Sequence, residues 1–129
     1  DFKGEIGKLG SKKYCEAEKG NIPNDMICED IGDKSIKLFN SVLSKSSTIV
    51  WNGTLGVAEN KIFAKGTESI IDFIVSKELT SIVGGGDTVA AIRNYKEEYI
   101  QEFSHASTGG GSCLELLSGN KLPAIEILK

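Results

Sequence analysis

The run Gly84-Gly85-Gly86-Asp87-Thr88 constrains this chain more than any other feature, because it separates two segments of different character. The short apolar run 81–83 precedes it, and a run of helical character, 89–92, follows it. Consecutive glycines leave the backbone bare, so its N–H groups can approach an anion closely where a helix N-terminus contributes its positive end. The sequence therefore predicts a strand, a phosphate-binding turn and a helix.

The acidic residue of this turn, Asp87, needs an explanation, because a carboxylate repels bound phosphate. One interpretation is that Asp87 caps the helix that follows, which would be the commoner role if the turn stood alone. The other is that Asp87 holds a hard cation such as Mg²⁺ between itself and the phosphates. The second interpretation predicts a nucleotide bound together with its metal ion.

Length and charge limit the possible classes of protein. A chain of 129 residues with 40% apolar content buries one core, so we expect one domain or part of one. The formal net charge of −3 and the scattered lysines argue against a nucleic-acid partner. No stretch approaches the roughly 20 apolar residues of a membrane span, and the first residues lack the apolar core of a signal peptide. A soluble, cytoplasmic protein is expected.

The three cysteines, Cys15, Cys28 and Cys113, are odd in number and widely spaced. The chain has no Cys-x-x-Cys pair and only one histidine, which disfavours both a structural zinc site and a disulfide framework. We expect these residues to behave as small apolar side chains in a reducing compartment.

Apolar runs that suit buried strands alternate with runs of helical period, which predicts an α/β fold with a parallel sheet wrapped by helices. The first 25 residues are expected to hold a strand and an exposed loop. The last helix is expected after the second glycine triplet, with a capping box formed by Ser112 and Glu115. The other predicted helices cover 33–45, 61–76 and 89–95, and the predicted strands cover 48–51, 81–83 and 103–107. The residues expected to share one face of the first helix are Ile36, Phe39, Val42 and Leu43. Those expected to face inward on the last helix are Cys113, Leu116 and Leu117.

Three predicted strand ends run into glycine-bearing turns, at 51–56, 84–88 and 108–111. In an open parallel sheet these turns lie along one edge, at the carboxyl ends of the strands, where ligands of such sheets bind. A single glycine triplet is also common in plain tight turns. Two triplets at matching places favour a shared cleft. The chain has neither a P-loop nor a Gly-x-Gly-x-x-Gly fingerprint.

Specific residues carry the interpretation further than these general motifs. Their order and spacing over about residues 24–129 resemble the carboxyl-terminal part of phosphoglycerate kinase. The matching segments are Asp30-Ile31-Gly32 with Lys34-Ser35 and Leu38-Phe39, Ile49-Val50-Trp51-Asn52-Gly53, Gly56-Val57 with Glu59, Phe63-Ala64-Lys65-Gly66-Thr67, Gly84 to Thr88, Phe103-Ser104-His105, Ser107 to Gly111, Leu114-Glu115-Leu116-Leu117 and Leu122-Pro123.

The resemblance implies reversible phosphoryl transfer between ATP with Mg²⁺ and 3-phosphoglycerate, in a glycolytic enzyme built from two doubly wound, Rossmann-like domains. This chain, 1–129, would be the later part of the nucleotide-binding domain, and 118–129 would be a tail that crosses back to the amino-terminal domain. The residues implied for nucleotide binding are Asn52, Gly56, Val57, Glu59, Gly84, Gly85, Gly86, Asp87 and Thr88. Glu59 would bind the ribose hydroxyls, Asp87 the metal ion, and Gly86 and Gly110 would lie at the transferred phosphoryl group.

The resemblance also implies what this chain lacks. The family's basic residues and its site for 3-phosphoglycerate or 1,3-bisphosphoglycerate belong to segments upstream of Asp1, so the chain alone is expected to be inactive. Its start at Asp agrees with an excised piece. Thr54 replaces a usual proline and Ala58 a usual phenylalanine, which predicts a looser wall beside the nucleoside. The alternative function is a free-standing nucleotide-binding or interaction module without catalysis.

Overall fold

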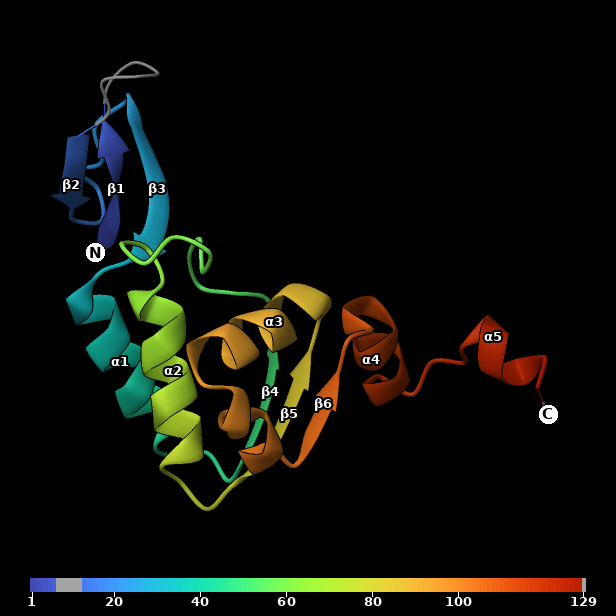
Figure 1. Ribbon diagram of the computed structural model, residues 1–129. Helices are drawn as coiled ribbons and strands as arrows, with labels where there is room; N and C mark the ends of the chain where they lie inside the picture. The colour runs from blue at the N-terminus through green and yellow to red at the C-terminus, as the bar shows by residue number, and fades with distance from the viewer. Residues whose placement is uncertain (7–12, 129) are drawn as a thin grey trace.

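The computed structural model describes residues 1–6 and 13–128, which form a small antiparallel sheet, a parallel sheet with its helices and a C-terminal tail (Figure 1). In chain order the elements are β1 (Phe2–Ile6), β2 (Lys13–Ala17), β3 (Met26–Ile31), α1 (Asp33–Leu43), β4 (Thr48–Asn52), α2 (Lys65–Val75), β5 (Thr80–Gly84), α3 (Gly86–Tyr95), the 3₁₀ helix η1 (Glu97–Glu102), β6 (His105–Ser107), α4 (Gly110–Leu117) and α5 (Pro123–Glu126).

The larger unit is an α/β fold around the parallel sheet β4-β5-β6. Apolar side chains of β4 and β5 pack against helices α2 and α3, and Phe103 belongs to the same buried cluster. Ile49 of β4 and Val83 of β5 are buried in this core, as expected for strands that form short apolar runs in the sequence. The predicted α/β class and its parallel sheet are therefore confirmed. The buried core consists of Ile49, Ile70, Ile71, Ile74, Val83, Val89, Ile92 and Phe103.

Three element boundaries differ from the predicted ones. Helix α2 begins at Lys65 rather than at 61, because residues 61–63 form a turn. Helix α3 begins at Gly86 rather than at 89, so part of the glycine run is helical. Strand β6 begins at His105 rather than at 103. The low helix propensity of glycine concealed the true start of α3 in the sequence.

The first 31 residues hold more β structure than was predicted. Strands β1, β2 and β3 form an antiparallel sheet in the order β2-β1-β3, with β1 at its centre. This sheet lies at one end of the larger unit, beyond helices α1 and α2 (Figure 1). Tyr14 of β2 stacks on Phe63, with ring centroids 6.3 Å apart, so the small sheet contacts the segment that precedes α2.

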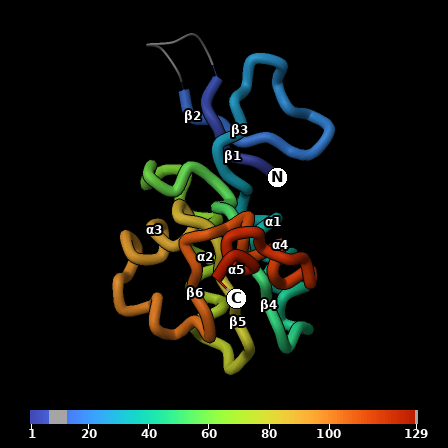
Figure 2. The backbone as a smooth tube through the Cα atoms, turned by 90° about the vertical axis from the view of Figure 1, so that its right-hand side faces the viewer, coloured from blue at the N-terminus to red at the C-terminus, as the bar shows by residue number. Residues whose placement is uncertain are grey.

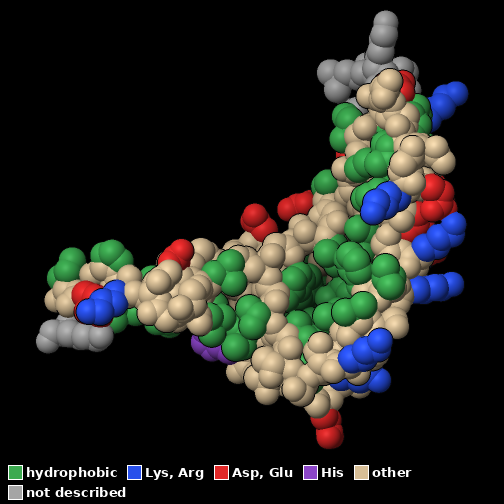
Figure 3. Space-filling view, turned by 180° about the vertical axis from the view of Figure 1, so that it is seen from behind, with side chains coloured by type: hydrophobic (Ala, Val, Ile, Leu, Met, Phe, Trp, Pro, Cys, Tyr) green, Lys and Arg blue, Asp and Glu red, His purple; other side chains and the backbone are tan. Residues whose placement is uncertain are grey.

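An apolar groove of about 410 Å³ runs along helix α1 and strand β4. Figure 3 shows hydrophobic side chains around this hollow. Phe39 and Val42 of α1 are 38% and 56% exposed here, and Val50 of β4 is 49% exposed. Phe39 and Val42, which were predicted to share a helical face with Ile36, line this groove together, and among these residues only Ile36 is buried.

Helix α4 and the tail also differ from expectation. The N-cap of α4 is Gly109, and Ser112 lies within the first helical turn, so the predicted capping box is wrong. Helix α4 begins two residues before the predicted cap, because Gly110 and Gly111 are already helical. Leu116 and Leu117 are 56% and 50% exposed, so the expectation that they face inward is also wrong. Helix α5 lies apart from the sheet, and in the view of Figure 2 the tail extends towards the reader.

Candidate functional site

The turns that follow the three parallel strands meet at one edge of the sheet. Asn52, Gly84 and Ser107 are partners in the parallel register, and each is the last residue of its strand. The N–H of Gly85 donates a 2.9 Å hydrogen bond to the carbonyl oxygen of Ser107, which extends the pairing by one residue. The prediction that the turns lie along the carboxyl edge of the sheet is therefore confirmed.

Two glycines, one from each triplet, are in close contact with Asn52. A Cβ atom added to Gly85 would lie 2.7 Å from the side-chain oxygen of Asn52, and one added to Gly110 would lie 2.9 Å from the same oxygen. The Gly110 position would also come within 3.0 Å of the Gly85 Cα. Gly85 has a φ of 101°, in the region that favours glycine. Backbone therefore approaches backbone here, which requires glycine at both positions.

Helix α3 starts within this cluster and directs its N-terminus to the sheet edge. Its first intrahelical bond runs from the Val89 N–H to the Gly85 carbonyl oxygen, at 3.0 Å. The N–H groups of Gly86, Asp87 and Thr88 belong to the first turn of the helix, so they have no acceptor within the helix. They stand where the helix dipole favours an anion.

Asp87 does not cap this helix. The N-cap is Gly85, no side chain makes a cap hydrogen bond, and Asp87 is an exposed residue of the first turn. Of the two interpretations of Asp87, capping is therefore excluded. Its carboxylate is left accessible beside the N–H groups, where a metal ion held by phosphates could reach it.

Thr88 lies inward. It is 1% exposed, and its hydroxyl oxygen accepts a 2.9 Å hydrogen bond from the Gly53 N–H. Its side chain therefore connects the turn after β4 with the first turn of α3. The implied contact between Thr88 and a nucleotide stays a prediction, and the backbone N–H is the part of the residue placed for it.

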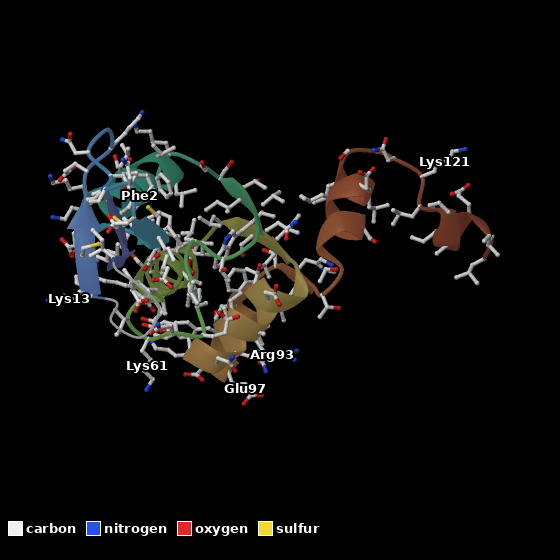
Figure 4. All side chains as sticks on the ribbon, turned by 90° about the horizontal axis from the view of Figure 1, so that it is seen from above. Phe2, Lys13, Lys61, Arg93, Glu97 and Lys121 are labelled. Atoms are coloured by element: carbon white, nitrogen blue, oxygen red, sulfur yellow. The ribbon has the colours of Figure 1, made fainter. Side chains whose placement is uncertain are left out.

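A second group of predicted residues, Gly56, Val57 and Glu59, lies in the loop between β4 and α2. The Val57 N–H donates a 2.9 Å hydrogen bond to the carbonyl oxygen of Glu29 in β3. Glu59 is exposed and lines an open cleft of about 530 Å³ with Ala58 and residues of α2 and α3. Lys61, the first residue of the predicted helix 61–76, lies in this loop (Figure 4) and lines the same cleft.

The structure thus brings the predicted residues together in two groups. The turn group comprises Asn52, Gly84 to Thr88 and Gly110, and the loop group comprises Gly56, Val57 and Glu59. The residues lining the cleft at Glu59 include no member of the turn group. A smaller cavity of about 330 Å³ lies between β3 and the loop, and is lined by Glu29 and residues 54–57 among others.

Two acidic residues of β3 were missed by the sequence analysis as contributors to this region. Asp30 is 4% exposed and accepts hydrogen bonds from the N–H groups of Gly66 and Ile31. Glu29 has a buried side-chain oxygen, Oε2, that receives no hydrogen bond. The sequence signal that could have revealed them is the pair of acidic residues inside a strand-like run. Such a pair is unusual, because carboxylates are seldom buried without partners.

Asp87 is the one carboxylate of the turn group. Within residues 1–6 and 13–128, no three His, Cys, Asp or Glu side chains form a group that could hold a metal ion. Mg²⁺ suits this arrangement, because it is usually bound through one or two carboxylates with phosphate oxygens and water completing its shell. None of the helices in the described residues is long and apolar enough to cross a membrane.

Comparisons with known proteins agree on one family. The family model of phosphoglycerate kinase matches residues 5–120. The chain is 48% identical over 117 residues to a phosphoglycerate kinase of Fervidobacterium nodosum, covering 88% of this chain and 28% of the relative. It is 46% identical over 130 residues to one of Bdellovibrio bacteriovorus, covering 96% of this chain and 32% of the relative.

Solved structures give the same result. The structure of phosphoglycerate kinase from Coxiella burnetii superposes with a TM-score of 0.83 at 31% identity, covering 99% of this chain and 33% of that one. The enzyme from Pyrococcus horikoshii gives a TM-score of 0.74 at 29% identity, covering 97% and 31%. The chain therefore spans about a third of the length of the proteins it matches.

Proposed function

Because this chain belongs to the phosphoglycerate kinase family, we propose that it forms the later part of that enzyme's nucleotide-binding domain and holds the phosphates of MgATP or MgADP. The observation that carries the proposal is the close approach of Gly85 and Gly110 around Asn52. It leaves backbone without Cβ atoms at the N-terminus of α3, where N–H groups can bind phosphate oxygens.

The reaction of the intact enzyme is the reversible transfer of a phosphoryl group between ATP and 3-phosphoglycerate. Such a transfer requires mainly alignment and neutralisation of the charge on the moving group. The N–H groups of Gly86 and Gly110 supply fixed donors on the transferred phosphoryl group. Mg²⁺, when bound with the nucleotide, neutralises phosphate charge, and Asp87 holds it at the turn.

The loop group binds the nucleoside. The Glu59 carboxylate accepts hydrogen bonds from the two ribose hydroxyls, and Gly56 and Val57 form the wall beside it. Val57 is 41% exposed and offers an apolar surface for this contact. Thr54 and Ala58, which replace the family's usual proline and phenylalanine, leave this wall less filled.

In this proposal the phosphoglycerate site and the family's basic residues lie in the part of the enzyme that this chain does not contain. The open apolar groove along α1 and β4 supports the proposal that another segment of the enzyme covers it. An uncovered sheet edge with exposed apolar side chains is unusual in a free domain. In the tail, 118–129, Ile127 and Leu128 are 84% and 87% exposed, which supports its crossing to the amino-terminal domain. A cytoplasmic location is part of this proposal.

The experiment that tests nucleotide binding is a calorimetric titration of MgADP into the chain, with circular dichroism to show that it is folded. Asp87→Asn should bind MgADP at least about tenfold more weakly, which corresponds to about 1.4 kcal/mol. Glu97→Gln, which removes an exposed carboxylate from η1, is the matched control and should bind like the original chain. A folded chain that does not bind MgADP at millimolar concentration would contradict the proposal. MgADP binding by the chain, combined with absence of kinase activity after the rest of the enzyme is supplied, would favour a binding module instead.

A further inference from the structure

A buried carboxylate on β3 contacts both the nucleoside loop and helix α2. Oδ2 of Asp30 accepts a 2.9 Å hydrogen bond from the N–H of Gly66, the second residue of α2. Oδ1 accepts a 2.8 Å bond from the N–H of Ile31. The N-cap of α2 is Ala64, which has no side-chain oxygen, so Asp30 supplies from a distant strand the acceptor that a capping residue normally gives.

Two glycines make room for this carboxylate. A Cβ atom on Gly66 would lie 2.3 Å from Asp30 Oδ1, and one on Gly56 would lie 2.5 Å from the same atom. Gly56 belongs to the loop group, so the side chain of Asp30 is enclosed between the nucleoside loop and the start of α2. At Gly56 the added Cβ would also lie 2.4 Å from the carbonyl oxygen of Phe63, so this glycine fits between the Asp30 carboxylate and the backbone.

The loop is fixed to β3 at a second point. The Val57 N–H donates to the Glu29 carbonyl oxygen at 2.9 Å, one residue from the Gly56 contact. Lys3, the register partner of Asp30 in β1, is 7% exposed and places a cation near the carboxylate. Burial raises the pKa of the Asp30 carboxyl, and the two N–H donors and Lys3 lower it, with burial the larger effect.

We propose that Asp30 is a positioning residue for ribose recognition: its carboxylate fixes Gly56 and the start of α2, and thereby places Glu59 at the ribose hydroxyls. The inference rests on the proposed nucleotide function and assigns to the small antiparallel sheet the task of supporting the nucleoside loop. Asp30 itself contacts no part of the nucleotide.

The test compares ADP with 2′,3′-dideoxy-ADP, each with Mg²⁺, by calorimetry. Since the dideoxy compound lacks both hydroxyls, the original chain should bind ADP about tenfold more tightly, as expected for hydrogen bonds to a charged acceptor. Asp30→Asn replaces one acceptor oxygen by an NH₂ group that faces a backbone donor. This variant should bind the two compounds equally, with its affinity for dideoxy-ADP unchanged. A general loss of structure would instead weaken binding of both.

Asp25→Asn is the matched control, because it makes the same change at an exposed residue just before β3. It should keep the preference for ADP. An Asp30→Asn variant that keeps the preference, or that loses affinity for both compounds alike, would overturn the proposal.

Amide hydrogen exchange provides a second readout that needs no nucleotide. In Asp30→Asn the amides of Val57 and Gly66 should exchange at least about tenfold faster, while those of Ile71 and Ile74 in the same helix should be unchanged. Unchanged exchange at Val57 and Gly66 would refute the positioning role even if the original chain bound no nucleotide. Faster exchange at these amides in a chain that binds no nucleotide would place the failure in the proposed function, with the support of the loop by Asp30 intact.

Discussion

The hydroxyl oxygen of Thr88 accepts a 2.9 Å hydrogen bond from the backbone N–H of Gly53. This bond joins the turn after β4 to the first turn of α3, and it is made by a residue that is 1% exposed. Thr88 therefore fixes the relative position of two turns that both belong to the proposed phosphate site. Its side chain acts on the backbone rather than on a ligand.

Thr88→Val tests this link, because valine has nearly the same shape but lacks the acceptor. The Gly53 N–H loses its partner, so we expect the free energy of unfolding to fall by about 1 kcal/mol and the MgADP affinity to fall with it. Thr88→Ser keeps the oxygen and should keep the affinity. Urea denaturation and calorimetric titration measure both quantities. Equal MgADP affinity in the valine and serine variants would contradict the role of the hydrogen bond.

The two glycine triplets provide a matched pair of substitutions. Gly85→Ala places a side chain at a φ of 101° and 2.7 Å from the Asn52 oxygen, so we expect a loss of about 2 kcal/mol or more in stability. Gly111→Ala has no atom within 4 Å of the new Cβ and lies in helix α4, so a gain of about 0.5 kcal/mol is expected. Thermal unfolding of both variants checks the contrast. Similar effects at the two positions would show that the turn geometry is wrong.

The parallel sheet and its turns could be predicted because buried parallel strands are short apolar runs that end in glycine. The convergence of Asn52, Gly85 and Gly110 follows from the same pattern, since three consecutive strand ends must share an edge in such a sheet. The boundaries were less accurate. Helix α3 begins inside the glycine run, where propensity predicts a turn and where the first helical N–H groups need no intrahelical acceptor.

The small antiparallel sheet could not be predicted from local pattern. Its central strand is only five residues long and has a glycine in the middle, and its register depends on partners in two other strands. The support given by Asp30 was missed for the same reason. Gly56 and Gly66 were recognised as parts of motifs, but only the fold shows that the same carboxylate lies against both.

The apolar faces of α1 and α4 show a further limit. A helical period in Phe39 and Val42, or in Leu116 and Leu117, predicts that a face is covered, but it does not predict by what. In the described residues these side chains are exposed. The proposal that this chain is part of a longer enzyme would place the covering surface in the rest of that enzyme.

Acid should destabilise the chain partly through Asp33. Hydrogen bonds from Lys3 and then Lys65 lower the pKa of this carboxyl from 3.8 to about 2. Because the folded pKa lies below the unfolded one, the stabilisation is complete above about pH 4 and is lost as the pH falls through 2. Urea unfolding between pH 5 and pH 2 should therefore show a weaker pH dependence in Asp33→Asn, and an intermediate one in Lys65→Met. A variant curve parallel to that of the original chain would contradict this assignment. The exposed position of the group predicts that added salt reduces the effect.

The cleft beside Glu59 follows from a departure from the family pattern, and filling it is a direct test. Ala58 lines this cleft of about 530 Å³, where the family usually has phenylalanine. Ala58→Phe should place a ring against the facing apolar side chains Ile71 and Ala91 and increase the free energy of unfolding by about 1 kcal/mol. MgADP affinity should also rise, because the loop that carries Glu59 would lose freedom before binding.

The control for this substitution is Ala90→Phe, which adds the same ring at an exposed position of α3 that does not line the cleft. It should leave stability within about 0.5 kcal/mol of the original value, as surface substitutions usually do. Chemical denaturation measures the difference between the two variants, and calorimetry measures MgADP affinity in each. If Ala58→Phe has no higher free energy of unfolding than Ala90→Phe, the ring does not enter the cleft. The looser wall beside the nucleoside then cannot be attributed to Ala58. If stability rises without a change in affinity, the cleft is filled but the order of the loop does not limit nucleotide binding.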